Sequence, residues 1–309
     1  MINFRYHVVS LTAVFLALAI GLVAGTAALN GPVSENLQNK LEELNKDNNV
    51  RREQVTQLNE AVNRNQDFAT QIAPMLLSGK LAGRKLAVVV LPGNEEPAEA
   101  VAKMLTVAGA TITARVEVEE KFFDASFVNE LLYLADESVQ DSIPAAGLPR
   151  NSDGIETASA LLALTLLQGP TTPTPGDVTA VLAAFAQPGY VTVQEGATGG
   201  AEAIVLVAGT PATDKTAERK SAAAVTVATE FRRNQPLIVV GDVAGDGNLV
   251  ASIRNDPSLA KDISTVDNLS TVQGQVVTAL VTADRLVTNR VGQYGTSAGA
   301  TAIVPSAAP

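Results

Sequence analysis

Lys85-Leu86-Ala87-Val88-Val89-Val90-Leu91 is an almost wholly apolar run, rich in β-branched residues, that stops at Pro92-Gly93. Such a run is typical of a strand buried on both faces, and strands of this kind occur in parallel sheets that helices cover. A helical stretch, 95–108, follows directly, and a second β-rich run occupies 110–118. This alternation predicts a mainly parallel α/β sheet.

The same alternation continues toward the C-terminus. Strands are predicted at 190–194, 203–208, 237–241 and 263–266, and helices at 127–136, 155–167, 177–186, 215–233 and 271–288. We therefore expect an α/β domain over 81–290. Residues 291–309 are rich in Gly, Ala and Ser, and we expect them to form a flexible C-terminal tail.

Toward the N-terminus, residues 8–29 form an apolar run without a charged side chain. As a helix this run would span about 33 Å, close to the roughly 30 Å hydrocarbon core of a membrane. Arg5 precedes it, so the positive-inside rule predicts a cytoplasmic N-terminus, 1–7, and a single pass of the cell membrane with the bulk outside. A signal peptide cleaved near residues 25–28 is the alternative, but the run is longer than the apolar part of most signals.

Small residues recur on one face of this predicted transmembrane helix. Ala17, Gly21 and Gly25 are spaced four apart. Small side chains let two helix backbones approach closely in lipid, so this face is a candidate transmembrane dimer face.

Residues 30–80 carry a sustained heptad pattern and are predicted to form a coiled-coil stalk. The d positions are Leu37, Leu44, Arg51, Leu58, Asn65 and Ile72, and the a positions are Leu41, Asn48, Val55, Val62, Ala69 and Leu76. A seven-residue period requires a partner helix, and Asn at an a position favours two strands in a fixed register. We expect a parallel homodimer; a helix of another protein and packing against the chain's own domain are the alternatives.

Charge and composition exclude several classes of function. The net charge is −10, and the first 80 residues, with 7 basic and 7 acidic side chains, contribute none of it. An acidic distal domain repels phosphate backbones, so no nucleic-acid partner is expected. There is no Cys, the only His is His7, and the three Met are scattered. We therefore expect no thiolate, His-based or thioether metal site, no cofactor and no enzymatic activity.

One Gly-rich loop could still bind a ligand. Asp242 and Asp246 lie in the loop 241–247, directly after a predicted strand. Open α/β sheets bind ligands at the carboxyl ends of their strands, and carboxylates suit a hard cation or a hydroxylated ligand. A Gly-rich turn with solvated Asp side chains is the alternative.

Several segments together resemble the actinobacterial MctB-like family. They are Ile2-Asn3-Phe4-Arg5-Tyr6-His7-Val8-Val9-Ser10-Leu11, Phe15-Leu16-Ala17-Leu18-Ala19-Ile20-Gly21, the turn at 271–274, Val291-Gly292-Gln293-Tyr294-Gly295 and the late Pro305. The family name implies copper export through an outer-membrane pore. The corynebacterial SteB branch instead implies daughter-cell separation, with a SteA-like cytoplasmic partner and peptidoglycan hydrolases of the RipA/RipC type. Within the resemblance, Gly292, Tyr294 and Gly295 form the family's C-terminal motif.

Residue types that bind copper are scarce in this sequence, and this argues against the copper interpretation. One apolar helix per chain is also too few to enclose a wide pore. We therefore expect a non-enzymatic envelope scaffold that links a cytoplasmic partner to cell-wall hydrolases during division. Copper transport or homeostasis is the alternative, and an extracytoplasmic domain that binds a small ligand or acts as an enzyme is a third hypothesis.

Overall fold

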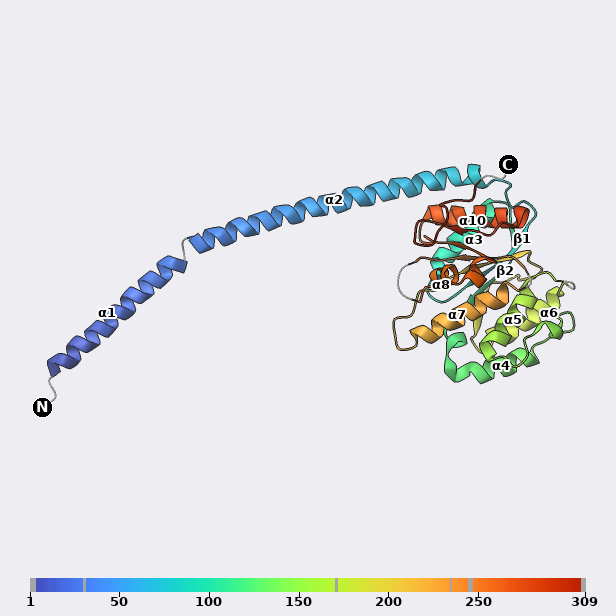
Figure 1. Cartoon of the computed structure of the whole chain (residues 1–309), viewed down its shortest axis with the longest axis horizontal. Coiled ribbons are helices and arrows are strands. Elements are labelled where there is room, and N and C mark those ends of the chain that lie inside the picture. The colour runs from blue at the N-terminus through green and yellow to red at the C-terminus, as the bar shows by residue number, and fades with distance from the viewer. Residues whose placement is uncertain (1–3, 30–31, 170–171, 234, 244–246, 307–309) are drawn as a thin grey trace. The chain divides into compact units, whose positions relative to one another are not determined.

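The computed structural model describes residues 4–29, 32–169, 172–233, 235–243 and 247–306. The chain divides into two compact units, a helical unit that ends at Asn65 and a globular unit that begins at Gln66 (Figure 1). The boundary therefore lies inside the stretch predicted as a stalk.

Two helices account for the helical unit. Helix α1 spans Phe4–Leu29, and its segment Phe4–Thr26 has a mean hydropathy of 2.5, so it is long and apolar enough to cross a membrane. Helix α2 spans Pro32–Leu77. Leu, Gln, Glu, Lys and Arg, all good helix formers, supply 21 of the 46 residues of α2. The helix is about 69 Å long. It ends where Gly79 takes a positive φ of 72°.

The globular unit is built on a seven-stranded sheet with the order β3-β2-β1-β4-β5-β6-β7. The strands are β1 Lys85–Val90, β2 Thr111–Val118, β3 Val191–Val193, β4 Ala203–Val207, β5 Leu237–Val240, β6 Ile263–Val266 and β7 Gln293–Tyr294. Six of them are parallel, and β3 pairs with β2 antiparallel. The predicted mainly parallel α/β sheet is thus confirmed.

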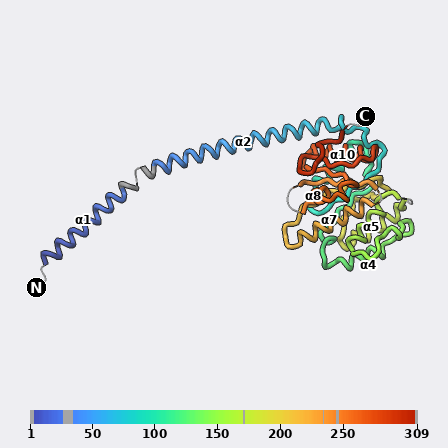
Figure 2. The backbone as a smooth tube through the Cα atoms, in the orientation of Figure 1, coloured from blue at the N-terminus to red at the C-terminus, as the bar shows by residue number. Residues whose placement is uncertain are grey.

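Helices cover both faces of the sheet, because the central strands are apolar on both sides. Ala87, Val89 and Leu91 face one core, which contains α4 (Val128–Glu137), α5 (Gly154–Leu166), α6 (Pro175–Ala186) and α7 (Ala217–Phe231). Leu86 and Val88 face the other core, with α3 (Glu95–Val107) and α10 (Val272–Thr288). In Figure 2, α4, α5 and α7 lie together on one side of the globular unit and α10 on the other.

The last turns of α2 belong to the second core. Ala73 and Leu77 are buried there beside Leu86, and Ala69 is only 7% exposed. Packing against the chain's own domain, one of the alternatives for the heptad pattern, therefore applies to this end of the helix. Ile72 is half-buried. Ala69 and Ile72, the last two seam positions before Pro74, are therefore less exposed than the seam positions that precede them.

The C-terminal segment completes the sheet, so the prediction of a flexible tail over 291–309 was wrong for its first part. Strand β7 pairs with β6 through Thr265 and Val266. After β7 the chain turns back, and the Thr301 amide donates to the Gln293 carbonyl at 2.7 Å. The strand is two residues long, and that is why an alternating or apolar pattern could not reveal it.

Short elements connect the larger ones. They are the 3-10 turns η1 Glu120–Phe123, η2 Ala125–Phe127 and η3 Ala145–Gly147, and the helices α8 Leu249–Asn255 and α9 Pro257–Ala260. Asn248 caps α8 by accepting a hydrogen bond from the Ala251 amide, and Asp256 caps α9 in the same way through Ser258.

Candidate functional site

The heptad seam is an exposed apolar surface over 37–62. Its six apolar members in this range are each more than half exposed: Leu37, Leu41, Leu44, Val55, Leu58 and Val62. Asn48 and Arg51 are exposed between them, and Asn65 at the end of the helical unit is exposed as well. Soluble surfaces rarely keep so many large apolar side chains in one line, so this surface is a candidate protein–protein interface.

The small-residue face of α1 is open along its length. A Cβ atom added at Gly21 or Gly25 would meet no heavy atom within 4 Å. Ala17 lies one turn before Gly21 on the same exposed face. This face can therefore admit a second helix at close range, as the spacing of the three residues predicts.

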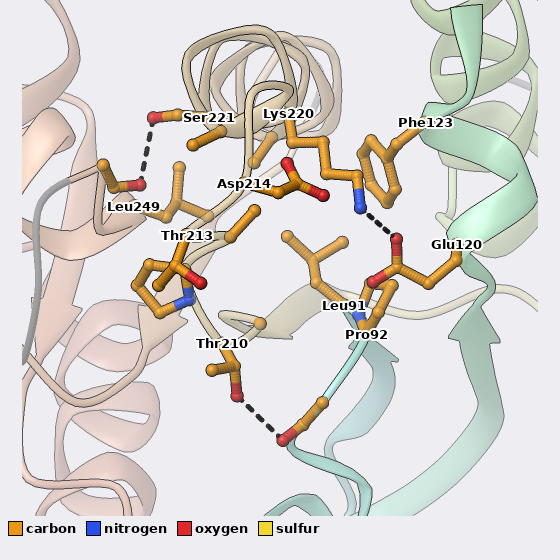
Figure 3. A pocket seen from close by; sticks show the side chains of 17 residues that line it. Leu91, Pro92, Glu120, Phe123, Thr210, Thr213, Asp214, Lys220, Ser221 and Leu249 are labelled. Atoms are coloured by element: carbon orange, nitrogen blue, oxygen red, sulfur yellow. Dashed lines mark hydrogen bonds and ion pairs between the residues drawn. The ribbon is translucent and has the colours of Figure 1, made fainter.

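A pocket of about 330 Å³ lies in the globular unit at the carboxyl ends of β1 and β4. The strand order reverses between these two strands, and open α/β sheets bind their ligands at such a switch point. The loops after β1, β4 and β5 and the turn η1 surround the pocket, as Figure 3 shows. The sequence did not reveal this pocket, because its residues come from three loops, the turn η1 and helix α7, which are far apart in the chain.

Several polar side chains of the pocket have ion-pair or hydrogen-bond partners within the chain. Lys220 Nζ lies 2.6 Å from Glu120 Oε2 across the opening (Figure 3). Asp214 accepts hydrogen bonds from the Thr216 hydroxyl at 2.6 Å and amide at 2.7 Å, and these bonds lower the pKa of the Asp214 carboxyl. Leu91, Phe123, Ala224 and Leu249 supply apolar walls.

Two glycines let the loops at this switch point approach closely. A Cβ at Gly209 would meet the Pro92 carbonyl oxygen at 2.5 Å, and a Cβ at Gly93 would meet the Thr210 hydroxyl at 2.8 Å. Gly93 also has a φ of 97°, which other residues rarely adopt. The Thr210 hydroxyl donates to the Gly93 carbonyl at 3.0 Å and joins the two loops.

The predicted ligand loop lies at the end of β5. Asp242 Oδ1 accepts from the Ser270 amide at 3.2 Å and hydroxyl at 3.3 Å, and the Asn248 amide group donates to the Asp242 carbonyl. Asp242 therefore joins the loop after β5 to the start of α10. Asp246 lies outside the described residues. Within the described ranges, no three His, Cys, Asp or Glu side chains are grouped so that they could hold a metal ion.

The C-terminal motif closes over a buried ion pair. Arg254 Nη1 and Asp267 Oδ2 lie 3.0 Å apart, and their side chains are 2% and 0% exposed. Arg254 also donates to the Tyr294 carbonyl at 2.7 Å, and Asp267 accepts from the Thr296 amide at 2.8 Å. Asp267 Oδ2, the oxygen paired with Arg254, also accepts from the Ser297 amide at 3.0 Å. The ion pair thus holds β7 and the turn after it.

The glycines of this motif are needed for close packing. A Cβ at Gly292 would meet the Tyr294 ring at 2.5 Å, and a Cβ at Gly295 would collide with the Asp267 carboxylate. Gly292, Tyr294 and Gly295 are therefore parts of a structural clamp. Sequence reasoning missed Arg254 and Asp267; the available signal was an Asp directly after a predicted strand, 13 residues beyond an Arg.

Comparisons with known proteins cover almost the whole chain. The sequence profile of a family described as "Copper transport outer membrane protein, MctB" matches residues 1–305. Proteins named "Copper transporter MctB" from Mycobacterium bovis and Mycobacterium tuberculosis are 30% identical over 99% of this chain and 100% of their own length. The protein of the same name from Mycobacterium leprae is 31% identical over 98% of this chain and 99% of its own length. A match of this extent includes the apolar helix, α2 and the sheet together, and the chain therefore belongs to the MctB family.

Proposed function

We propose that this chain serves copper transport or copper homeostasis in the cell envelope, as a membrane-anchored subunit. The observation that carries the proposal is full-length kinship with proteins named copper transporters, since the match includes the anchor, α2 and the sheet. In this proposal α1 spans the cell membrane once. Arg5 keeps the N-terminus in the cytoplasm, and the globular unit lies outside.

In this proposal the chain assembles other components and is not itself the main copper ligand. It has no Cys, a single His at the membrane-proximal end and three dispersed Met, and these are the residue types that soft copper prefers. The exposed seam of α2 and the open face of α1 are the surfaces available for assembly. The chain then needs no reaction or cofactor of its own.

Copper sensitivity of a deletion strain tests the proposal. Loss of the gene should lower the copper concentration that stops growth and raise the cell-associated copper measured by mass spectrometry. The wild-type chain should reverse both effects, whereas a variant with Lys at Leu44 and Leu58 should reverse neither, because a charge at each position disrupts the seam. Unchanged tolerance and copper content in the deletion strain would contradict the proposal.

A second candidate is a scaffold for daughter-cell separation, and the exposed seam favours it. Six apolar side chains on one line of a helix between a membrane anchor and a globular unit suit a protein that recruits others. Its partners would be a SteA-like cytoplasmic protein and a RipA/RipC-type peptidoglycan hydrolase or its regulator. This candidate predicts chains of unseparated cells on deletion, with copper content unchanged. Affinity purification from membranes should then recover such a hydrolase or its regulator.

A further inference from the structure

We propose that residues 37–62 of α2 pair with the same segment of a second copy, in parallel and in register, and that Asp47 and Arg52 select this pairing. The inference deepens the proposed assembling role and rests on it. Three observations support it: the exposure of the seam, the charges beside it and the anchor that precedes it.

The apolar pattern by itself requires a partner but does not set its direction. From Leu37 to Val62 the seam reads as three apolar positions, then Asn48 and Arg51, then three apolar positions. Read backwards, it gives the same pattern. Parallel and antiparallel pairs would therefore both match apolar side chains with apolar side chains.

The flanking charges distinguish the two directions. With Leu41 at a, the g positions are Lys40, Asp47 and Gln54, and the e positions five residues later are Asn45, Arg52 and Asn59. In a parallel pair each g side chain faces the e side chain of the other copy. Asp47 then faces Arg52 of the second copy, twice by symmetry, and no like charges meet.

Other arrangements lose these ion pairs. A slip of one heptad places Asp47 opposite Asn45 or Asn59, and it places Asn48 opposite an apolar residue. In register, Asn48 faces its own copy, and the two amides can hydrogen-bond. An antiparallel pair brings g to g and e to e, so that Asp47 never faces Arg52.

Asp47 also offsets the unfavourable Arg51 in the seam. It lies one turn before Arg51 on the same helix, at the i,i+4 spacing that favours ion pairing. The anchor favours the same direction, because α1 precedes α2 in both copies and both would enter one membrane. The charges beside the seam, the register of Asn48 and the preceding anchor therefore all favour a parallel dimer.

Cysteine crosslinking of the full-length chain in membranes tests this pairing, since the wild type has no Cys. Leu44→Cys lies in the seam, and the matched control Lys46→Cys lies two residues away on the outer face. Mild oxidation should convert Leu44→Cys to a covalent dimer at least about tenfold more than the control, because d positions face each other. Equal crosslinking at both positions, or a product that contains a different protein, would overturn the proposal.

Charge reversal in the Leu44→Cys background tests the selecting residues. Asp47→Arg and Arg52→Asp should each lower the crosslinked fraction by about threefold at low salt, because each change replaces two attractive charge pairs with two repulsive ones. The effect should shrink in 1 M salt. The double variant Asp47→Arg/Arg52→Asp should restore crosslinking. Circular dichroism should show unchanged helix content in all three.

Failure of the double variant to restore crosslinking would overturn the roles of Asp47 and Arg52. Preferential crosslinking of Leu44→Cys to a copy carrying Val55→Cys would show an antiparallel pair and overturn the register. The growth and the copper content of the deletion strain do not depend on either result. A chain that restores copper tolerance while its Leu44→Cys variant stays monomeric would refute the dimer and leave the proposed function intact.

Discussion

Replacement of Asp267 by Ala should destabilise the globular unit more than any change at an exposed ion pair. The substitution leaves the Arg254 guanidinium 2% exposed and without its carboxylate. It also removes the acceptor of the Thr296 and Ser297 amides, which hold the turn after β7.

The magnitude follows from burial. Removal of one partner of a buried ion pair costs about 3–5 kcal/mol, because the remaining charge stays desolvated. For a domain of this size, each kcal/mol lowers Tm by about 2–4 °C. We therefore expect Tm of the Asp267→Ala chain to fall by about 6–20 °C. Glu120→Ala is the control: Glu120 lies 2.6 Å from Lys220 but is 67% exposed, so its loss should cost less than about 1 kcal/mol.

Urea unfolding of the full chain in detergent can measure both variants. The chain has no Trp, and Tyr190 and Tyr294 are buried, so tyrosine fluorescence reports on the globular unit. A double variant, Arg254→Met/Asp267→Leu, should recover part of the lost free energy, because it buries no unpaired charge. If Asp267→Ala and Glu120→Ala lowered the free energy of unfolding equally, burial would not be the reason for the effect.

Three further predictions concern single positions. Gly295→Ala should lower the free energy of unfolding by at least roughly 2 kcal/mol, because φ is 129° and the new Cβ would collide with Asp267. Burial raises the pKa of Glu230 to about 6, so the globular unit should lose stability as pH rises through 6, and its stability at pH 7 should lie about 2 kcal/mol below that at pH 4.5 from this group alone. In Glu230→Gln, this part of the pH dependence should vanish from urea unfolding curves. Asp242→Ala should restore growth on copper as well as wild type does if its role is to join two loops; loss of complementation with unchanged stability would indicate a ligand.

The sheet was largely predictable because its strands are unambiguous. Runs such as 85–91 and 203–208 are apolar on both faces and end at Gly or Pro, and the observed strands agree with the predicted ranges within one or two residues. The antiparallel direction of β3 was not predictable, since its three residues carry no signal about which neighbour they join. The short helix α8 was hidden beside the Gly-rich loop that precedes it.

The sites were less predictable than the fold. The seam could be found because its residues repeat every seven positions along one helix. The pocket and the Arg254–Asp267 pair depend on which strand ends become neighbours, and that follows from the strand order. Neither a period nor a local motif encodes this order, so the residues involved look like ordinary loop residues in the sequence.

The place of β7 at the edge of the sheet has a consequence for how the chain is made. Strand β6 can pair with β7 only after residues 293–294 have also been synthesised. Until then, the backbone N–H and C=O groups along one edge of β6 are unpaired. Such an edge can pair with a strand of another chain and so promote aggregation. A chain truncated before residue 293 would keep that edge open and should aggregate or be degraded more readily than the full chain.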